Sequence, residues 1–216
     1  MRVLGFDPSL TNFGWAGFDS GEPELSPTRC FDRGRFQTSS KTLFIDRYVD
    51  LRDRTIDLVR TTGVTLIGIE YPVFNDLWSE GMYGLFLYTC EALRILGVDV
   101  VFFSPMQIKA HARLFLDRPK GWKMMKGDMV EAAKVHTGGA GRWNHNEADA
   151  YWVACIACRF WQFLAGEITE ADLTPVEKKQ FTLIHTYVRG KKAGQTIKRG
   201  ILYREDERFF RWSQED

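Results

Sequence analysis

Three acidic residues stand where a carboxylate can do chemistry at the end of a buried element. Asp7 and Glu70 each close an apolar run, and Asp149 lies in the polar head of a long apolar segment at 151–164. Desolvating a carboxylate is costly unless a positive or hydrogen-bonding group meets it, so each of these residues needs a partner. Together the three would suit two Mg²⁺ or Mn²⁺ ions, which prefer hard oxygen ligands.

Such a pair of ions, held about 3.5–4 Å apart, stabilises both the attacking and the leaving oxygen of an in-line displacement at phosphorus. We assign the bridging position to Asp7. Each acid alone also has a purely structural explanation; Asp149, for example, could be a first-turn charge favoured by the helix dipole. The interpretation therefore depends on the three residues converging.

The elements that must bring them together follow from the apolar periodicity of the chain. Three strands come first, and helices and strands then alternate. The expected strands are 3–6, 13–18, 30–36, 64–70 and 98–103, and the expected helices are 41–62, 81–96, 105–116, 126–136 and 151–164. This order predicts an α/β fold with an RNase H-like mixed five-stranded sheet flanked by helices. In that layout Asp7 and Glu70 end neighbouring central strands, and Asp149 opens a helix across them.

Composition places few limits on this interpretation. The 216 residues are 44% hydrophobic, enough for one sizeable core. The most apolar stretch, 148–165, contains two charges and is too short for a membrane span, and no signal peptide is expected. We therefore expect a cytoplasmic protein, in the host cytoplasm if it is phage-encoded. The Cys155/Cys158 pair lies in an apolar helical pattern, which predicts buried core and not a redox or zinc site.

Charge is unevenly distributed although the net charge is only +1. Residues 107–142 hold eight Lys and Arg against three Asp and Glu, and residues 176–211 hold ten against four. Segregation of this kind suits a polyanionic ligand, through phosphate contacts and counterion release. Solvated helix faces are the alternative explanation.

Four segments resemble the motifs of RuvC-type Holliday junction resolvases, in a phage-like form. They are residues 5–14, 67–70, 104–109 and 146–150, in the family's order, and the resemblance covers residues 1–165. It implies a homodimeric endonuclease with two Mg²⁺ or Mn²⁺ ions per site, which nicks opposed strands of a four-way DNA junction. The catalytic residues that it implies are Asp7, Glu70, Asp149, Lys109 and Lys126.

The chain departs from this family at one position. Three residues before the last aspartate the family has an acidic residue or histidine, whereas this chain has Asn146. On a helix Asn146 shares a face with Asp149 and could offer a carbonyl oxygen. We expect Asn146 to be the fourth metal ligand, with His145 or Glu147 as alternatives.

A further set of residues is expected to contact DNA. Phe74 follows the second motif, where the family inserts an aromatic wedge at the junction centre, and it could stack on a base; a core position is the alternative. Residues 166–216 form a basic and aromatic extension, with a hairpin turning near 191–195, which could contact DNA or act as a dimer arm. The full DNA-binding set is Phe74, Arg113, Lys120, Lys123, Arg142, Lys191, Lys192, Lys198 and Arg199.

Two other functions remain open from the sequence, and a third is excluded. A nuclease of the same superfamily could cut branched or flapped DNA with loose selectivity. A junction-binding protein without catalysis is suggested only by Asn146. An actin-like sugar kinase also begins with an aspartate in a strand-turn-strand, but it needs a second phosphate loop and about twice the length.

Overall fold

A computed structural model describes residues 2–19, 30–71, 80–119, 121–139, 141–181, 184–186 and 196–198. The strands are β1 (Arg2–Asp7), β2 (Asn12–Asp19), β3 (Cys30–Gln37), β4 (Leu66–Glu70), β5 (Asp99–Phe103), β6 (Ile184–Thr186) and β7 (Thr196–Lys198). The α-helices are α1 (Phe44–Thr62), α2 (Glu80–Leu96), α3 (Pro105–Ala112), α4 (Lys126–His136), α5 (His145–Leu164) and α6 (Pro175–Phe181). Short 3₁₀ turns, η2 (Arg113–Phe115) and η3 (Glu170–Asp172), follow α3 and precede α6.

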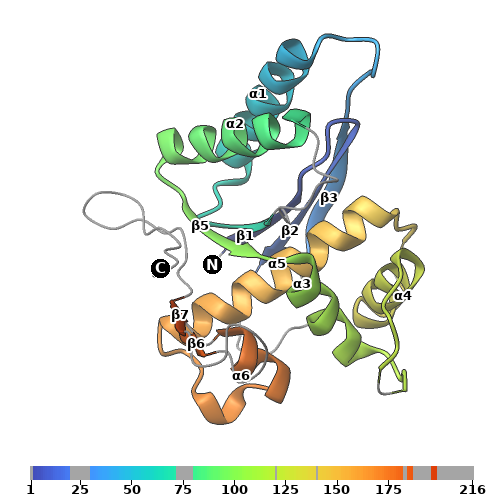
Figure 1. Ribbon diagram of the computed structural model, residues 1–216, viewed down its shortest axis with the longest axis vertical. Helices are drawn as coiled ribbons and strands as arrows, with labels where there is room; N and C mark the ends of the chain where they lie inside the picture. Colours follow the sequence, from blue (N-terminus) through green and yellow to red (C-terminus); the bar gives the residue numbers. More distant parts are fainter. Residues whose placement is uncertain are drawn as a thin grey trace.

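The main sheet has the strand order β3-β2-β1-β4-β5. The first three strands form an antiparallel meander, and β4 and β5 continue the sheet in parallel with β1. Figure 1 shows the strands running between two layers of helices. The mixed five-stranded sheet predicted from the sequence is confirmed, including the adjacency of β1 and β4 at its centre.

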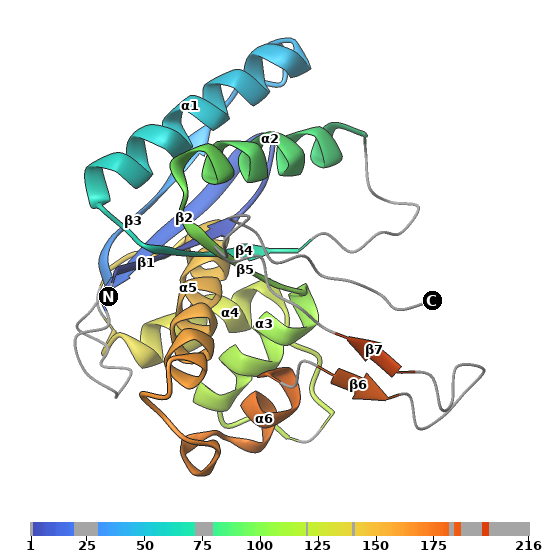
Figure 2. The same cartoon turned by 90° about the vertical axis from the view of Figure 1, so that its left-hand side faces the viewer.

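Helices cover both faces of this sheet. Figure 2 shows α1 and α2 on one side of the sheet, and α3, α4 and α5 on the other. Alternation along each strand divides the core accordingly, because successive side chains point to opposite faces. Leu4 and Phe6 pack with the α1 and α2 layer, whereas Val3 packs with α5.

Helix α5 is enclosed nearly all round. Every residue from 150 to 158 is buried, because the sheet lies on one side of the helix and α3 and α4 lie on the other. Cys155 and Cys158 are both buried in this stretch, which confirms that the CxxC pair belongs to the core. Within the described part of the chain, no helix combines the length and the apolarity that crossing a membrane requires.

The segment after α5 is packed onto the same core. Ile168, Leu173 and Phe181 are buried in the cluster around α5. Arg159 of α5 donates from Nε to Glu177 Oε1 of α6 at 2.9 Å, and both side chains are largely buried. Residues 166–181, which the sequence analysis assigned to the extension, are thus joined to α5 by both apolar and ionic contacts.

Farther along, β6 and β7 pair antiparallel, with Thr186 opposite Thr196. This pairing agrees with the predicted hairpin, although its turn lies outside the described residues. The side chain of Lys198 in β7, and the residues Phe74, Lys120, Lys191, Lys192 and Arg199, also lie outside the part of the structure that can be described.

Candidate active site

Asp7 and Glu70 lie side by side on the face of the sheet that α5 covers. Strands β1 and β4 run parallel with Gly5 opposite Gly68, and each strand ends two residues later, on Asp7 or on Glu70. Residues two apart share a face of a strand. Both carboxylates therefore emerge on the same side of the sheet, at the carboxyl ends of neighbouring strands.

Glycines on the strands let α5 approach this face closely. A Cβ at Gly5 would collide with the backbone of Ala150 and Ala154, and a Cβ at Gly68 would lie 2.8 Å from the Cβ of Ala157. Without side chains at these two positions, α5 can lie directly on the sheet backbone. Asp149, adjacent to Ala150 in the first half of α5, is consequently delivered next to the two strand ends.

The three carboxylates share one electrostatic environment. Burial, followed by the charges of Glu70 and Asp149, raises the pKa of Asp7 well above its usual range. Burial, with the Asp149 charge next, raises the pKa of Glu70 to about 7. Burial also raises the pKa of Asp149 to about 6. The convergence predicted from the sequence is therefore present, and it concentrates negative charge that needs a counter-cation.

Two lysines partly oppose this negative charge. Lys126, the first residue of α4, lowers the pKa of all three acids, and Lys109 of α3 lowers those of Glu70 and Asp149. The three acids are partly buried, whereas both lysine side chains are exposed. The acids therefore lie on the inner side of the site and the lysines on its solvent side, where a ligand can approach.

Helix α3 is held firmly where it presents Lys109. Ser104 and Gln107 form a reciprocal capping box at its start, and Pro105 occupies the first turn. Gln180 of α6 donates from Nε2 to the Gln107 carbonyl oxygen at 2.7 Å. The basic helix predicted from the sequence is therefore anchored both by its own cap and by α6.

The loop that follows Asp7 is fixed by hydrogen bonds to successive carbonyl groups. The Thr38 hydroxyl donates to the carbonyl oxygen of Leu10, and the Thr38 amide donates to that of Thr11 at 3.3 Å. The Asn146 side-chain amide donates to the carbonyl oxygen of Asn12. These contacts join the loop to the end of β3 and to the start of α5, and so hold Asp7 in place.

The three candidates for a fourth ligand have different contacts. Asn146 uses its NH₂ group on Asn12, which leaves its Oδ1 for other partners. The Nδ1 atom of His145 lies 3.3 Å from the Lys126 carbonyl oxygen, and the charge of His145 lowers the pKa of Asp149. His145 therefore links the starts of α4 and α5.

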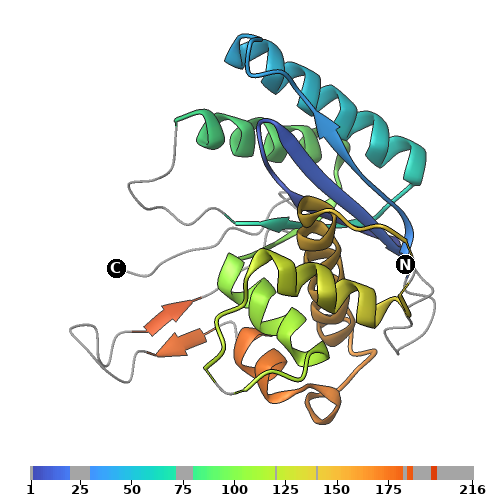
Figure 3. The ribbon, with the colours of Figure 1, turned by 90° about the vertical axis from the view of Figure 1, so that its right-hand side faces the viewer.

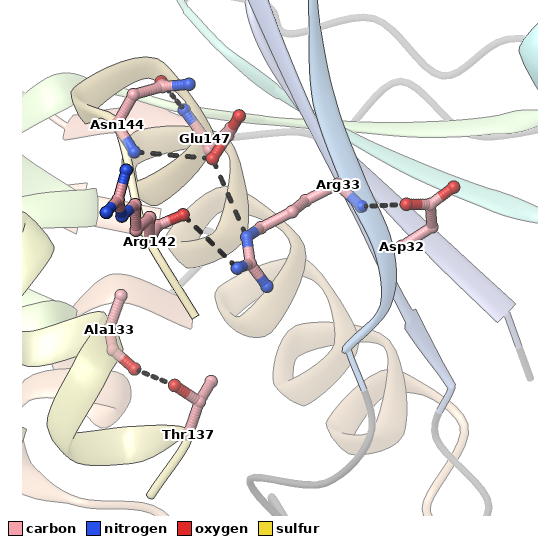
Figure 4. Close-up of polar contacts among 7 residues, drawn as sticks. All are labelled: Asp32, Arg33, Ala133, Thr137, Arg142, Asn144 and Glu147. Atoms are coloured by element: carbon pink, nitrogen blue, oxygen red, sulfur yellow. Dashed lines mark hydrogen bonds and ion pairs between the residues drawn. The ribbon is translucent and has the colours of Figure 1, made fainter. Parts of the chain in front are cut away.

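Glu147 is engaged elsewhere, as Figure 4 shows. Its amide donates to Asn144 Oδ1 at 2.9 Å, and its carboxylate accepts from the Asn144 amide at 3.4 Å, which forms a capping box for α5. Its Oε2 atom also lies 3.7 Å from Arg33 Nε. These contacts tie the Glu147 carboxylate to the cap of α5 and to strand β3.

Arg33 is a site-supporting residue that sequence reasoning did not identify. Besides pairing with Glu147, it donates to the Arg142 carbonyl oxygen at 3.4 Å, and its guanidinium carbon lies 3.8 Å from the centre of the Trp143 ring. It thereby joins the edge of the sheet to the segment that leads into α5. An arginine in an edge strand carries no motif, so only the fold could have indicated this role.

The donor chemistry of the acids fits Mg²⁺ or Mn²⁺. Asp7, Glu70 and Asp149 supply only oxygen atoms, and each carries a raised pKa that a bound divalent cation would lower again. Among the described residues, no three Asp, Glu, His or Cys side chains already surround a point at ligand distance. The fit therefore rests on the type of donor atom and on the shared charge.

The predicted DNA-binding residues that can be described lie at the surface near α3, α4 and α5. Lys123 and Arg142 are exposed, and Arg113 is partly buried. Arg113 donates to the carbonyl oxygens of Pro119 and Trp122, so it supports the loop between α3 and α4.

The fold matches that of solved RuvC structures. RuvC from Thermus thermophilus aligns with a TM-score of 0.62 and 18% identity over 75% of this chain and 96% of that chain. T. thermophilus RuvC in complex with a Holliday junction substrate aligns equally well, at 19% identity. No protein-family model matches the sequence, and no curated protein matches it either. At this identity the similarity establishes a RuvC-like, RNase H-like fold.

Proposed function

We propose that this protein is a metal-dependent endonuclease that resolves four-way DNA junctions by paired nicks. The observation that carries the proposal is the cluster of Asp7 and Glu70 at adjoining strand ends with Asp149 of α5. Burial raises the pKa of all three acids, the charges of neighbouring acids raise those of Asp7 and Glu70 further, and two lysines lower them. The fold supports it, because RuvC, which shares this fold, has been solved with a Holliday junction substrate.

Each residue of the cluster has a distinct task in this proposal. Asp7, whose pKa responds to both other acids, takes the central bridging position. Two bound Mg²⁺ or Mn²⁺ ions would supply an activated water and stabilise the leaving oxygen. Lys109 and Lys126 place positive charge beside the scissile phosphate, where negative charge increases in the transition state. Asn146 holds the loop after Asp7 and can offer Oδ1 to the site.

Paired nicking also requires two active sites. Each chain would supply the Asp7, Glu70 and Asp149 cluster, so a homodimer would present a second copy of it to the opposed strand of the junction. The basic residues of the extension would lie along the DNA arms and contribute phosphate contacts.

The test is cleavage of a labelled immobile four-way junction by the purified full-length chain with Mg²⁺ or Mn²⁺. Symmetric nicks in opposed strands are expected, and none with Asp7→Asn. Forks and flaps built from the same arm sequences serve as matched substrates. Equal cleavage of these would favour a broader branched-DNA nuclease, and binding without nicking in either metal would favour a non-catalytic junction-binding protein.

A further inference from the structure

Trp122 is a large aromatic side chain exposed to solvent in the loop between α3 and α4. It is 46% exposed. The sequence marks this loop only by its basic residues, and the proposed chemistry does not use the tryptophan. An exposed aromatic among basic side chains is what single-stranded or unpaired nucleic acid recognises, because phosphates meet the charges and bases stack on the ring.

The loop holds this ring in a defined orientation. Trp122 Nε1 donates to Asp128 Oδ2 at 3.2 Å, and the Trp122 amide donates to the Pro119 carbonyl oxygen at 3.1 Å. Arg113 donates to the Trp122 carbonyl oxygen at 3.5 Å. The only polar atom of the indole is therefore satisfied, and what remains exposed is apolar ring surface.

Asp128 is the residue that fixes the loop. It also accepts from the Met125 amide at 2.8 Å and from Arg118 at 3.4 Å, and these bonds, the one to Met125 foremost, lower its pKa. The Arg118 guanidinium lies 5.7 Å from the centre of the Trp122 ring. Asp128, at the start of α4, thus binds both the Arg118 guanidinium and the Trp122 ring.

Asp128 also places Trp122 near the candidate active site. Asp128 belongs to the first turn of α4, which begins with Lys126, and Lys126 acts electrostatically on all three site carboxylates. Figure 3 shows the loop from α3 to α4 on the side of the molecule where β4 ends. The loop that holds Trp122 therefore leads directly into Lys126, the lysine that acts on the site carboxylates.

We infer that Trp122 stacks on a nucleobase of the DNA held at this site, with Lys123 contacting a neighbouring phosphate. The inference rests on the proposed function, since it requires a DNA strand at the carboxylate cluster. An unpaired or splayed base offers the flat face that an indole with a fixed edge can cover.

The test compares Trp122→Leu with Trp122→Phe, because both lose the bond to Asp128 but only phenylalanine keeps an aromatic face. Affinity for an immobile four-way junction is measured in EDTA at several salt concentrations. We expect Leu to weaken binding at least about tenfold and Phe to remain within about threefold of wild type. The slope of log affinity against log salt should be unchanged in both, because stacking releases no counterions.

Two matched variants and a thermal unfolding curve for each protein serve as controls. Lys123→Ala should flatten the salt slope by about 0.9, and Ile95→Ala, at a residue 68% exposed on α2, should leave affinity unchanged. Wild-type affinity in folded Trp122→Leu, equal losses in Leu and Phe, or a flatter slope in Leu would each overturn the inference. Absence of junction binding by the wild type would instead refute the proposed function.

Discussion

At the scale of single residues, the site is defined by how strongly each carboxylate depends on the others. Burial raises the pKa of Asp7, and the charges of Glu70 and Asp149 raise it further. The ionised form of such a residue is unfavourable in the metal-free protein and would be stabilised between two cations. Its removal should therefore affect catalysis and stability in opposite directions.

Asp7→Asn should abolish nicking while junction binding persists, because binding depends on basic side chains. The expected loss is at least about 10³-fold in single-turnover rate. The metal-free protein should gain about 1 kcal/mol in free energy of unfolding, because repulsion among the carboxylates is relieved. Cleavage assays, gel shifts and urea unfolding in EDTA measure the three quantities; nicking within tenfold of wild type would refute the bridging role.

Asn146 makes a separate prediction, because its NH₂ group donates to the Asn12 carbonyl oxygen. Asn146→Ala should cost about 1–2 kcal/mol in EDTA by removing that bond. Asn146→Asp should cost more, since it places an acceptor against an acceptor and adds a fourth carboxylate. Added Mn²⁺ should raise the melting temperature of the Asp variant more than that of the Ala variant. Wild-type stability of Asn146→Asp in EDTA would show that the bond to Asn12 is unimportant.

At the scale of elements, the glycines on β1 and β4 decide whether α5 can reach the sheet. Gly68→Ala would put a methyl group within 3 Å of Val153 and Ala157, so a loss of about 1–3 kcal/mol is expected from overpacking. Gly127→Ala is the control, because no atom lies within 4 Å of its added methyl group. In helix α4 that change should stabilise by about 0.5–1 kcal/mol. Thermal unfolding checks both, and equal effects would contradict the close packing of α5.

The sequence predicts the elements well because each has a local signature. Alternating and continuous apolar runs identified β1 and β4, and the strand ends marked Asp7 and Glu70. Asp149 was expected to open α5, whereas the structure begins the helix four residues earlier, at His145, and Asn144 provides the cap. Polar residues in a first turn obscure the apolar period that was used to find the helix.

Contacts between distant segments had no such signature. Only the tertiary fold brings together the residues in three such contacts. They are the hydrogen bond from Thr38 to the loop after Asp7, the ion pair of Arg33 with Glu147, and the hydrogen bond from Asn146 to Asn12. Hydrogen bonds of this kind impose no periodicity on the chain. The identity of the carboxylates was therefore accessible from the sequence, whereas the residues that support them were not.

At the scale of the whole molecule, the carboxylate cluster sets the pH dependence of the metal-free protein. Glu70 has a pKa of about 7 in the folded state against an ordinary 4.5, so the folded state keeps a proton that the unfolded state has lost. Stability should fall as pH rises from about 4.5 through about 7, by up to about 3 kcal/mol. Urea unfolding in EDTA between pH 5 and 8 measures this, and Glu70→Gln should flatten the slope. An unchanged slope in Glu70→Gln would assign the effect to other groups.

The C-terminal part makes a prediction about where the chain can be shortened. A chain ending at Gly166 would leave Arg159 without Glu177 and uncover the surface that Phe181 fills, which should cost about 3–5 kcal/mol. A chain ending at Phe181 keeps both contacts and should fold. It should bind junction DNA more weakly, with a flatter salt dependence, if the remaining extension contacts phosphates. Thermal unfolding and salt titrations distinguish these outcomes; equal stability of the two shortened chains would contradict the role of α6.

The glycine-lined face of β1 and β4 also has a consequence for synthesis on the ribosome. Strand β1 is among the first elements made, yet the helix that covers it comes only with residues 145–164. At about 5–20 residues per second, strand β1 would wait roughly 10–30 s for this cover. During that interval Asp7 and Glu70 remain hydrated and apart from Asp149. A nascent chain would therefore hold no assembled carboxylate cluster until α5 has been made and has docked.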